Sequence, residues 1–350
     1  MRNLIGLREF SKEWWESLYA RCCDIIDNPG MYIDSCRGKI LATMFYEPST
    51  RTSFSFQSAA QRLGAGIIGF SDPLGTSASK GETFADTVKM ISSYSDTIVI
   101  RSPLEGAAEA ASMYSDIPVI NAGDGGHFHP TQTLADLATI AQKRGEIGNF
   151  RIGLCGDLKY GRTVHSIVEA FAAFPNITFH LISPDELRMP DYVLRQMRLR
   201  GQDFFETEKF AQSIPELDIL YMTRIQRERF HSSAEYRRLK GVFVLTNELL
   251  RSAKSDMLIM HPLPRYGEID PEVDSDSRSV YFEQARFGMY IRMALLLDFM
   301  HKPVLSPPPI VSTDSKMCKN PACITQTETY LPQSGSSDNP NICRYCDKSF

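Results

Sequence analysis

Short apolar runs that alternate with helical patterns are the feature that most constrains the fold of this 350-residue chain. Strands that alternate with helices form parallel sheets covered on both faces. Strands are expected at residues 40–46, 65–70, 97–100, 118–121, 150–155, 177–182, 218–222, 242–244 and 257–260. Helices are expected at residues 11–27, 83–94, 104–114, 131–144, 161–174 and 282–300, with another ending near residue 64. The sequence therefore predicts an α/β fold with two doubly wound parallel-sheet domains.

Changes in this pattern divide the chain into four parts. In chain order, we expect a first α/β domain at residues 1–145, a second at 146–302 whose last helix (282–302) packs back on the first domain, a linker at 303–317 and a small C-terminal domain at 318–350. The linker is rich in proline, including Pro307–Pro309, and should be semi-extended. The last part is too short to fold on a hydrophobic core alone.

The composition is that of a soluble protein that does not bind nucleic acid. A net charge of −4 gives no global basic field, and 43% hydrophobic residues is an ordinary value. No apolar run approaches the roughly 20 residues that span a bilayer. Residues 1–15 are interrupted by charges and lack the apolar core of a signal peptide, so we expect a cytoplasmic protein without a membrane partner.

The eight cysteines fall into two groups. Four are scattered and are expected to be free thiols in a reducing compartment: Cys22, Cys23, Cys36 and Cys155. The others form a C-x4-C…C-x2-C pattern: Cys318, Cys323, Cys343 and Cys346. This spacing predicts one zinc ion per chain, tetrahedral and structural, because four thiolates leave no position open for a reactant. The alternative is four free cysteines in a disordered tail.

Residues 47–53 (Glu-Pro-Ser-Thr-Arg-Thr-Ser) follow a predicted buried strand and precede a helix. The first turn of a helix offers N–H groups and a positive dipole end, which suit a phosphate. Arg51 adds a planar fork that binds phosphate oxygens in pairs. The stretch therefore indicates a phosphate cradle. The alternative is a solvated Ser/Thr turn that only caps the helix.

Other polar clusters also come directly after predicted strands, where ligands bind in parallel sheets. Together with the cradle they lie at residues 47–53, 101–103, 127–132, 156–162, 223–229 and 261–265. Their cations, with one lysine from the loop at 71–81, are Arg51, Lys80, Arg101, Lys159, Arg162, Arg224 and Arg265. Burying an unpaired guanidinium is costly, so a cleft lined by them expects two or more anionic groups. Each arginine taken singly could instead be a solvated surface residue.

Signatures of several other reaction classes are absent from the sequence. A G-x-G-x-x-G string at residues 64–69 comes at a helix end and runs into a strand, the reverse of a dinucleotide site. There is no Walker-type P-loop and no nucleophile-elbow pattern. These absences favour a reaction that proceeds by positioning and charge stabilisation, without a catalytic cofactor or covalent intermediate.

Several motifs resemble those of the carbamoyltransferases. They are Ser-Thr-Arg-Thr-Ser at 49–53, His-Pro-Thr-Gln at 129–132, Gly-Asp-Leu-Lys-Tyr-Gly-Arg-Thr-Val-His-Ser at 156–166, Thr-Arg-Ile-Gln at 223–226 and His-Pro-Leu-Pro at 261–264. The last four are similar to the aspartate branch, and the resemblance covers residues 1–302. It implies transfer of the carbamoyl group of carbamoyl phosphate to the amine of L-aspartate, a step of pyrimidine biosynthesis. The products would be N-carbamoyl-L-aspartate and phosphate, by way of a tetrahedral intermediate and closure of the two domains.

The resemblance also implies residue roles. The expected catalytic residues are Arg51, Thr52, Lys80, Arg101 and His129; Thr52, Arg101 and His129 would polarise the carbonyl oxygen. The expected residues for carbamoyl phosphate are Ser49, Thr50, Arg51, Thr52, Ser77, Lys80, Arg101, His129, Gln132, Leu263 and Pro264, with Gln132 on the carbamoyl NH2. Those for aspartate are Lys80, Arg162, Arg224, Gln226 and Leu263, the last through its backbone. In the family a serine and a lysine, here Ser77 and Lys80, enter from a neighbouring subunit, so a homotrimer with shared active sites is expected, with a dimer of trimers as a further possible assembly.

Residue pairs that stabilise the closed form are also expected. Glu47 should pair with Arg162 or Arg229, and Glu235 with Lys159 or Tyr160. His261 is expected to order its loop rather than to react.

The residues around the four clustered cysteines resemble the zinc domain of the family's regulatory chain. In that chain a nucleotide-binding domain precedes the zinc domain, and the 15-residue linker here has no room for one. We therefore predict a fusion without the ATP/CTP site, in which the zinc module docks on a catalytic domain, its own or a neighbour's, and strengthens assembly. Two alternatives remain for the function: a carbamoyltransferase for another amine, and an inactive paralogue that serves assembly.

Overall fold

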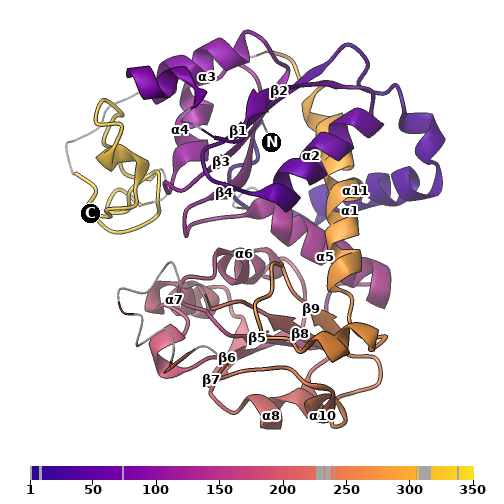
Figure 1. Cartoon of the computed structure of the whole chain (residues 1–350). Helices are drawn as coiled ribbons and strands as arrows, with labels where there is room; N and C mark the ends of the chain where they lie inside the picture. The colour runs from indigo at the N-terminus through magenta and orange to yellow at the C-terminus, as the bar shows by residue number, and fades with distance from the viewer. Residues whose placement is uncertain are drawn as a thin grey trace. The chain divides into compact units, whose positions relative to one another are not determined.

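The computed structural model describes residues 2–7, 10–72, 75–225, 232, 238–239, 241–304, 306, 317–336 and 339–350. Contacts within the chain define two compact units. The first comprises residues 1–9, 13–131 and 289–350, and the second comprises residues 10–12 and 132–288. The division falls inside two helices, α5 (Pro130–Arg144) and α11 (Tyr281–Phe299). Each unit is therefore assembled from segments that are distant in sequence (Figure 1).

The first unit contains a four-stranded parallel sheet (Figure 1). Its strands are β1 (Ile40–Phe45), β2 (Gly66–Phe70), β3 (Thr97–Ser102) and β4 (Val119–Asp124), in the order β2-β1-β3-β4. Its other helices are α1 (Lys12–Asp27), α2 (Thr50–Arg62), α3 (Phe84–Ser92) and α4 (Ala107–Tyr114). Strands β1 and β3 are almost entirely buried, as expected for a sheet with helices on its faces. The strand order reverses between β1 and β3, the point at which ligands bind in such sheets.

The second unit contains a five-stranded parallel sheet with the same kind of reversal. Its strands are β5 (Phe150–Cys155), β6 (Ile177–Ile182), β7 (Asp203–Thr207), β8 (Ile219–Met222) and β9 (Leu258–Met260), in the order β7-β6-β5-β8-β9. Its other helices are α6 (Arg162–Phe171), α7 (Asp191–Leu199), α8 (Phe210–Ser213) and α10 (Asn247–Leu250). Here the order reverses between β5 and β8.

The predicted α/β class with two parallel sheets is confirmed, but two strand assignments were wrong. The expected strand at 242–244 is irregular, with one bridge between Leu245 and Ile269 beside it. Phe243 and Leu245 are buried there, so the apolar run reflects a loop packed on the core. Strand β7 was missed because it lies at the sheet edge, where most of its residues are partly or fully exposed and give no apolar run.

The four-cysteine module, residues 317–336 and 339–350, packs on the first unit of its own chain. Figure 1 shows it in yellow beside α4. Tyr345 and the four cysteines share a buried cluster with the alanine-rich α4. Gly106, with φ +84°, is the N-cap residue of this helix, and a Cβ atom there would lie 2.4 Å from that of Tyr345. The structure thus gives a docking partner for the module, while the predicted borders of the four domains stay predictions.

No helix in the described part of the chain is long and apolar enough to cross a membrane.

Candidate active site at two strand-order reversals

The first reversal brings together the ends of β1 and β3. Phe45, the last residue of β1, is paired in register with Arg101, the penultimate residue of β3, and Tyr46 N donates to Arg101 O at 2.8 Å. Arg101 Nη2 lies 2.7 Å from Glu47 Oε1, and Arg101 Nη1 donates to Ala122 O at 3.3 Å. The Arg101 side chain is only 12% exposed, so its guanidinium is held in a defined direction.

The predicted cradle begins α2 at this same sheet edge. Ser49 is the N-cap residue, yet its side chain makes no capping hydrogen bond, so the turn is not explained as a cap alone. Thr50 and Arg51 are exposed and Thr52 is 8% exposed. The turn therefore presents a cation and hydroxyls at a helix N-terminus, the arrangement that binds a phosphate group.

Other predicted residues of the first unit lie in loops near the sheet. His129 is buried between β4 and α5, directly before Pro130. Ser77 and Lys80 begin and end the short 3-10 helix at Ser77–Lys80, and both are exposed. Among the described residues, no ion pair involves Lys80.

The second reversal brings together the ends of β5 and β8. Thr223 N donates to Cys155 O at 2.8 Å, and Asp157 N donates to Thr223 Oγ1 at 2.9 Å. Gly156 has φ +117°, and a Cβ atom there would lie 2.5 Å from Thr223 O. Only glycine lets the two strand ends approach this closely. The contact fixes the start of the segment that carries Arg224.

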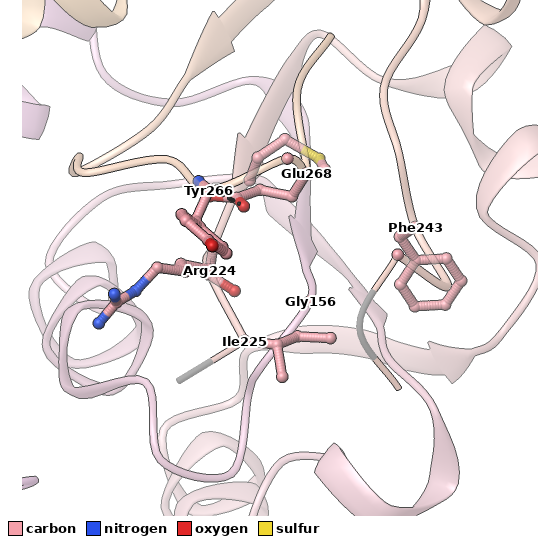
Figure 2. A pocket seen from close by; sticks show the side chains of 10 residues that line it. Gly156, Arg224, Ile225, Phe243, Tyr266 and Glu268 are labelled. Atoms are coloured by element: carbon pink, nitrogen blue, oxygen red, sulfur yellow. Dashed lines mark hydrogen bonds between the residues drawn. The ribbon is translucent and has the colours of Figure 1, made fainter. Parts of the chain in front are cut away.

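A pocket of about 130 Å³ lies at this reversal (Figure 2). Its lining residues are Gly156, Met222, Thr223, Arg224, Ile225, Gly241, Phe243, Tyr266, Gly267 and Glu268. Figure 2 shows Arg224 and Tyr266 close together on one side and Phe243 on the other. Arg162 is the first residue of α6, the helix that follows β5. Arg162 and Arg224 are both half-buried, and Arg224 lines the pocket, so its guanidinium suits a carboxylate there.

The His261 loop is held by a chain of hydrogen bonds within the second unit. His261 N donates to Gln284 Oε1 at 3.0 Å, and Leu263 N donates to His261 Nδ1 at 2.7 Å. His261 Nε2 lies 2.7 Å from Glu268 Oε1. Burial tends to raise the pKa of the Glu268 carboxyl, but the hydrogen bond and charge of His261 hold that pKa below its usual value. These contacts fit the expectation that His261 orders its loop.

Leu263 lies in the left-handed region, with φ +54°, and a cis peptide bond joins it to Pro264. A leucine adopts this conformation only where its surroundings impose it. The bond from Leu263 N to His261 therefore fixes the direction of the Leu263 backbone, the group predicted to contact the amine.

The structure distributes the predicted site residues over both units. The first unit holds Ser49, Thr50, Arg51, Thr52, Ser77, Lys80, Arg101 and His129. The second holds Gln132, Arg162, Arg224, Leu263 and Pro264. Gln132 Nε2 donates to the buried Asp136 at 2.8 Å, which orients its amide. Gln226 lies outside the described residues, as do Arg229 and Glu235 of the predicted closing pairs.

One predicted cation is paired with a carboxylate of its own unit, and two residues that line the pocket were not predicted. Arg265 bonds Asp274 through both terminal nitrogens, so its charge is already neutralised. Tyr266 and Glu268 line the pocket at the second reversal, although no motif in the sequence marked them. The weak signal that could have found them is their position directly after the His-Pro-Leu-Pro motif.

The four clustered cysteines are buried, and their sulfur atoms lie within 4.8 Å of one another. The Sγ atoms of Cys318 and Cys346 are 3.5 Å apart, and those of Cys323 and Cys343 are 3.9 Å apart. These distances are too long for disulfides. A zinc–sulfur bond of about 2.3 Å places the sulfurs of a tetrahedral site about 3.8 Å apart. The cluster therefore fits a four-coordinate metal ion, and the burial of all four cysteines argues against the alternative of free cysteines in a disordered tail.

Comparisons with known proteins agree with the arrangement of both units. Residues 2–142 match the family model "Aspartate/ornithine carbamoyltransferase, carbamoyl-P binding domain", and residues 148–299 match the model of its "Asp/Orn binding domain". The aspartate carbamoyltransferase catalytic subunit of Clostridium novyi (strain NT) is 55% identical over 295 residues, 84% of this chain and 96% of that protein.

Solved structures give the same result. The catalytic subunit of M. jannaschii aspartate transcarbamoylase superposes with a TM-score of 0.80 at 42% identity, over 86% of this chain and 98% of that one. The Trypanosoma cruzi enzyme, solved in complex with carbamoyl phosphate, has a TM-score of 0.80 at 35% identity, over 85% and 95% of the two chains.

Proposed function

The chain belongs to the aspartate/ornithine carbamoyltransferase family, and we propose how its residues transfer the carbamoyl group of carbamoyl phosphate to L-aspartate. The amine nitrogen attacks the carbonyl carbon, a C–N bond forms, and the C–O bond to phosphate breaks. Negative charge grows on the carbonyl oxygen in the tetrahedral intermediate, so donors fixed around that oxygen lower the barrier. Positioning and charge stabilisation suffice for this substitution, which needs no catalytic cofactor.

The first unit would bind carbamoyl phosphate. The α2 N-terminus, with Ser49, Thr50 and Arg51, holds the phosphate, and Thr52 turns toward the carbamoyl group. Arg101 and His129 donate to the carbonyl oxygen. The geometry that supports this is the fixed guanidinium of Arg101 beside the N-terminus of α2. The departing phosphate accepts the proton that the amine loses.

The second unit would bind L-aspartate. Arg162 and Arg224, supported by Gln226, hold its two carboxylates, and the Leu263 backbone accepts from the amine. Gln132 holds the carbamoyl NH2, and Pro264 contacts carbamoyl phosphate. The reaction joins the two substrates, so the proposal requires groups of both units to act on one substrate pair. Closure of the units over that pair, through Glu47 and Glu235, stays a prediction.

The observation that carries the proposal is that both strand-order reversals bear arginines at the ligand-binding edge of a parallel sheet. The test is release of phosphate from carbamoyl phosphate by the purified protein, first with L-aspartate and then with L-ornithine. We expect turnover with aspartate alone. Equal turnover with ornithine would contradict the choice of substrate, and no turnover with either would favour the inactive paralogue.

The four-cysteine cluster would hold one structural zinc ion, through Cys318, Cys323, Cys343 and Cys346. Because the module is too small to fold on its own core, metal binding supplies its folding energy. Elemental analysis should give one zinc per chain, and Cys343→Ser should lower that content. Full zinc binding by Cys343→Ser would contradict this ligand set.

Assembly and location are the last parts of the proposal. Exposed Ser77 and Lys80 would enter a neighbouring active site, so we expect a homotrimer. We also expect the protein in the cytoplasm. Mixing an inactive Lys80→Ala chain with an inactive Arg224→Ala chain should restore activity, because some mixed sites then carry both intact residues. No restored activity in verified mixed trimers would argue against shared sites.

A further inference from the structure

The four-cysteine module contacts two loops that lie next to the proposed carbonyl-polarising residues in the sequence. One loop, residues 103–106, follows β3, whose last two residues are Arg101 and Ser102. The other, residues 125–129, follows β4 and ends with His129. Both contacts are made within the first unit, by the chain's own module. The docking face is therefore not remote from the reaction.

Glu105 joins the first loop to the module through backbone and side chain. Glu105 N donates to Ala322 O at 2.8 Å, and Ile324 N donates to Glu105 O at 2.9 Å. The Glu105 carboxylate is 5% exposed and accepts from Asn320 and from Lys348, whose Nζ lies 2.8 Å from Oε2. Four bonds from one residue fix this loop against the module.

His127 joins the second loop to the module. His127 Nε2 lies 3.0 Å from Asp347 Oδ2, and its Nδ1 lies 3.0 Å from Asp124 Oδ2. Asp347 follows Cys346 directly in the sequence. The His127 imidazole thus connects a residue beside the metal cluster to a carboxylate at the end of β4.

Asp124 then connects both loops to each other. It is 1% exposed and accepts from the backbone N–H groups of Gly106 at 2.8 Å and Phe128 at 3.0 Å. Gly106 ends the loop that follows Arg101 and Ser102 at the end of β3, and Phe128 immediately precedes His129. A shift of Asp124 or of His127 would therefore move both loops together.

We propose that Asp347 is a positioning residue of the carbamoyl transfer, acting through His127 and Asp124 on the loops of Arg101 and His129. The proposal rests on the roles given above to Arg101 and His129. The four-cysteine module would then restrain the two loops in addition to folding as a small domain. It contributes no atom to the substrates, and it acts by limiting how far the two loops can move.

The test compares variants of the full-length, zinc-loaded protein. In Asp347→Ala we expect kcat to fall roughly tenfold, because small displacements of reacting groups are costly, with the KM for aspartate unchanged. Asp347→Asn should recover most of the lost kcat, since its amide oxygen can still accept from His127. The matched control is Arg344→Ala, which removes another ion pair of the same module, 2.8 Å from Glu109 on α4, and should keep kcat.

Three results would overturn the proposal: a wild-type kcat in zinc-loaded Asp347→Ala, an equal loss of kcat in Arg344→Ala, or no recovery in Asp347→Asn. If Asp347→Ala loses zinc or does not fold, His127→Gln cuts the same connection while leaving the module sequence intact, and an unchanged kcat there also overturns it. Failure of the proposed function has a different signature, since then the wild-type protein is inactive or His129→Ala stays active.

Discussion

The two strand-order reversals carry arginines in different surroundings. At the first, the Arg101 guanidinium is nearly buried and held by Glu47 and a β4 carbonyl. At the second, Arg224 lines a pocket of about 130 Å³, and the close contact there is between the backbones of Gly156 and Thr223. The two reversals therefore differ in what is fixed: a buried guanidinium at the first and a close backbone contact at the second. Under the proposed role of Arg101, this suits a donor to a developing oxyanion, because such donors act best when they are preorganised.

The largest effect is expected for Arg101→Ala. Loss of a fixed donor to the carbonyl oxygen should lower kcat roughly 100- to 1000-fold, with a much smaller change in the KM for aspartate. Steady-state kinetics with both substrates measures this. If the KM for aspartate rose instead while kcat stayed unchanged, Arg101 would bind aspartate rather than stabilise the carbonyl oxygen.

Gly156→Ala should destabilise the fold by about 3 kcal/mol, because the added Cβ meets a carbonyl oxygen and the backbone is left-handed. Gly201→Ala is the matched control: Gly201 has φ +67°, but nothing lies within 4 Å of the position that its added Cβ would take, so only the backbone cost of about 1 kcal/mol applies. Denaturant unfolding compares them. Equal losses would mean that the close approach at the second reversal has no energetic weight.

Arg224→Lys should raise the KM for aspartate roughly 10- to 100-fold, because an ammonium cannot bind a carboxylate through a planar fork. The KM for carbamoyl phosphate should not change. Arg151→Lys is the control, since Arg151, near the start of β5, is an exposed arginine that pairs with Glu216. An unchanged KM for aspartate in Arg224→Lys would remove this arginine from the proposed site.

The smallest effect is expected for Glu268→Gln, which weakens the connection to His261 by about 1–2 kcal/mol. The pKa of Glu268 is lowered in the folded state, so its contribution is present above the unfolded value of about 4.3 and is lost as pH falls through the lower folded value. The stability difference between wild type and variant should therefore be largest above about pH 5 and shrink in acid. A difference that grew in acid would contradict the assigned sign.

The sequence predicted most of the strands of the second unit but few of the residues that line its pocket. The runs at 150–155 and 177–182 were placed correctly because buried parallel strands are continuously apolar. Strand β7 and the loop at 242–244 were misassigned because edge strands and packed loops break that relation between burial and pattern. Arg265 was counted with the substrate-binding cations because sequence gives no sign of its pairing with Asp274.

The sequence by itself determined the α/β class, the residues that follow each strand and the four-cysteine pattern, since all three depend on local periodicity and spacing. Only the tertiary structure decided the strand order, and with it which strand ends lie at each reversal. It also places the four-cysteine module on the first unit and Asp347 beside His127, 220 residues away. Such contacts depend on long-range packing, and no local pattern of residues encodes them.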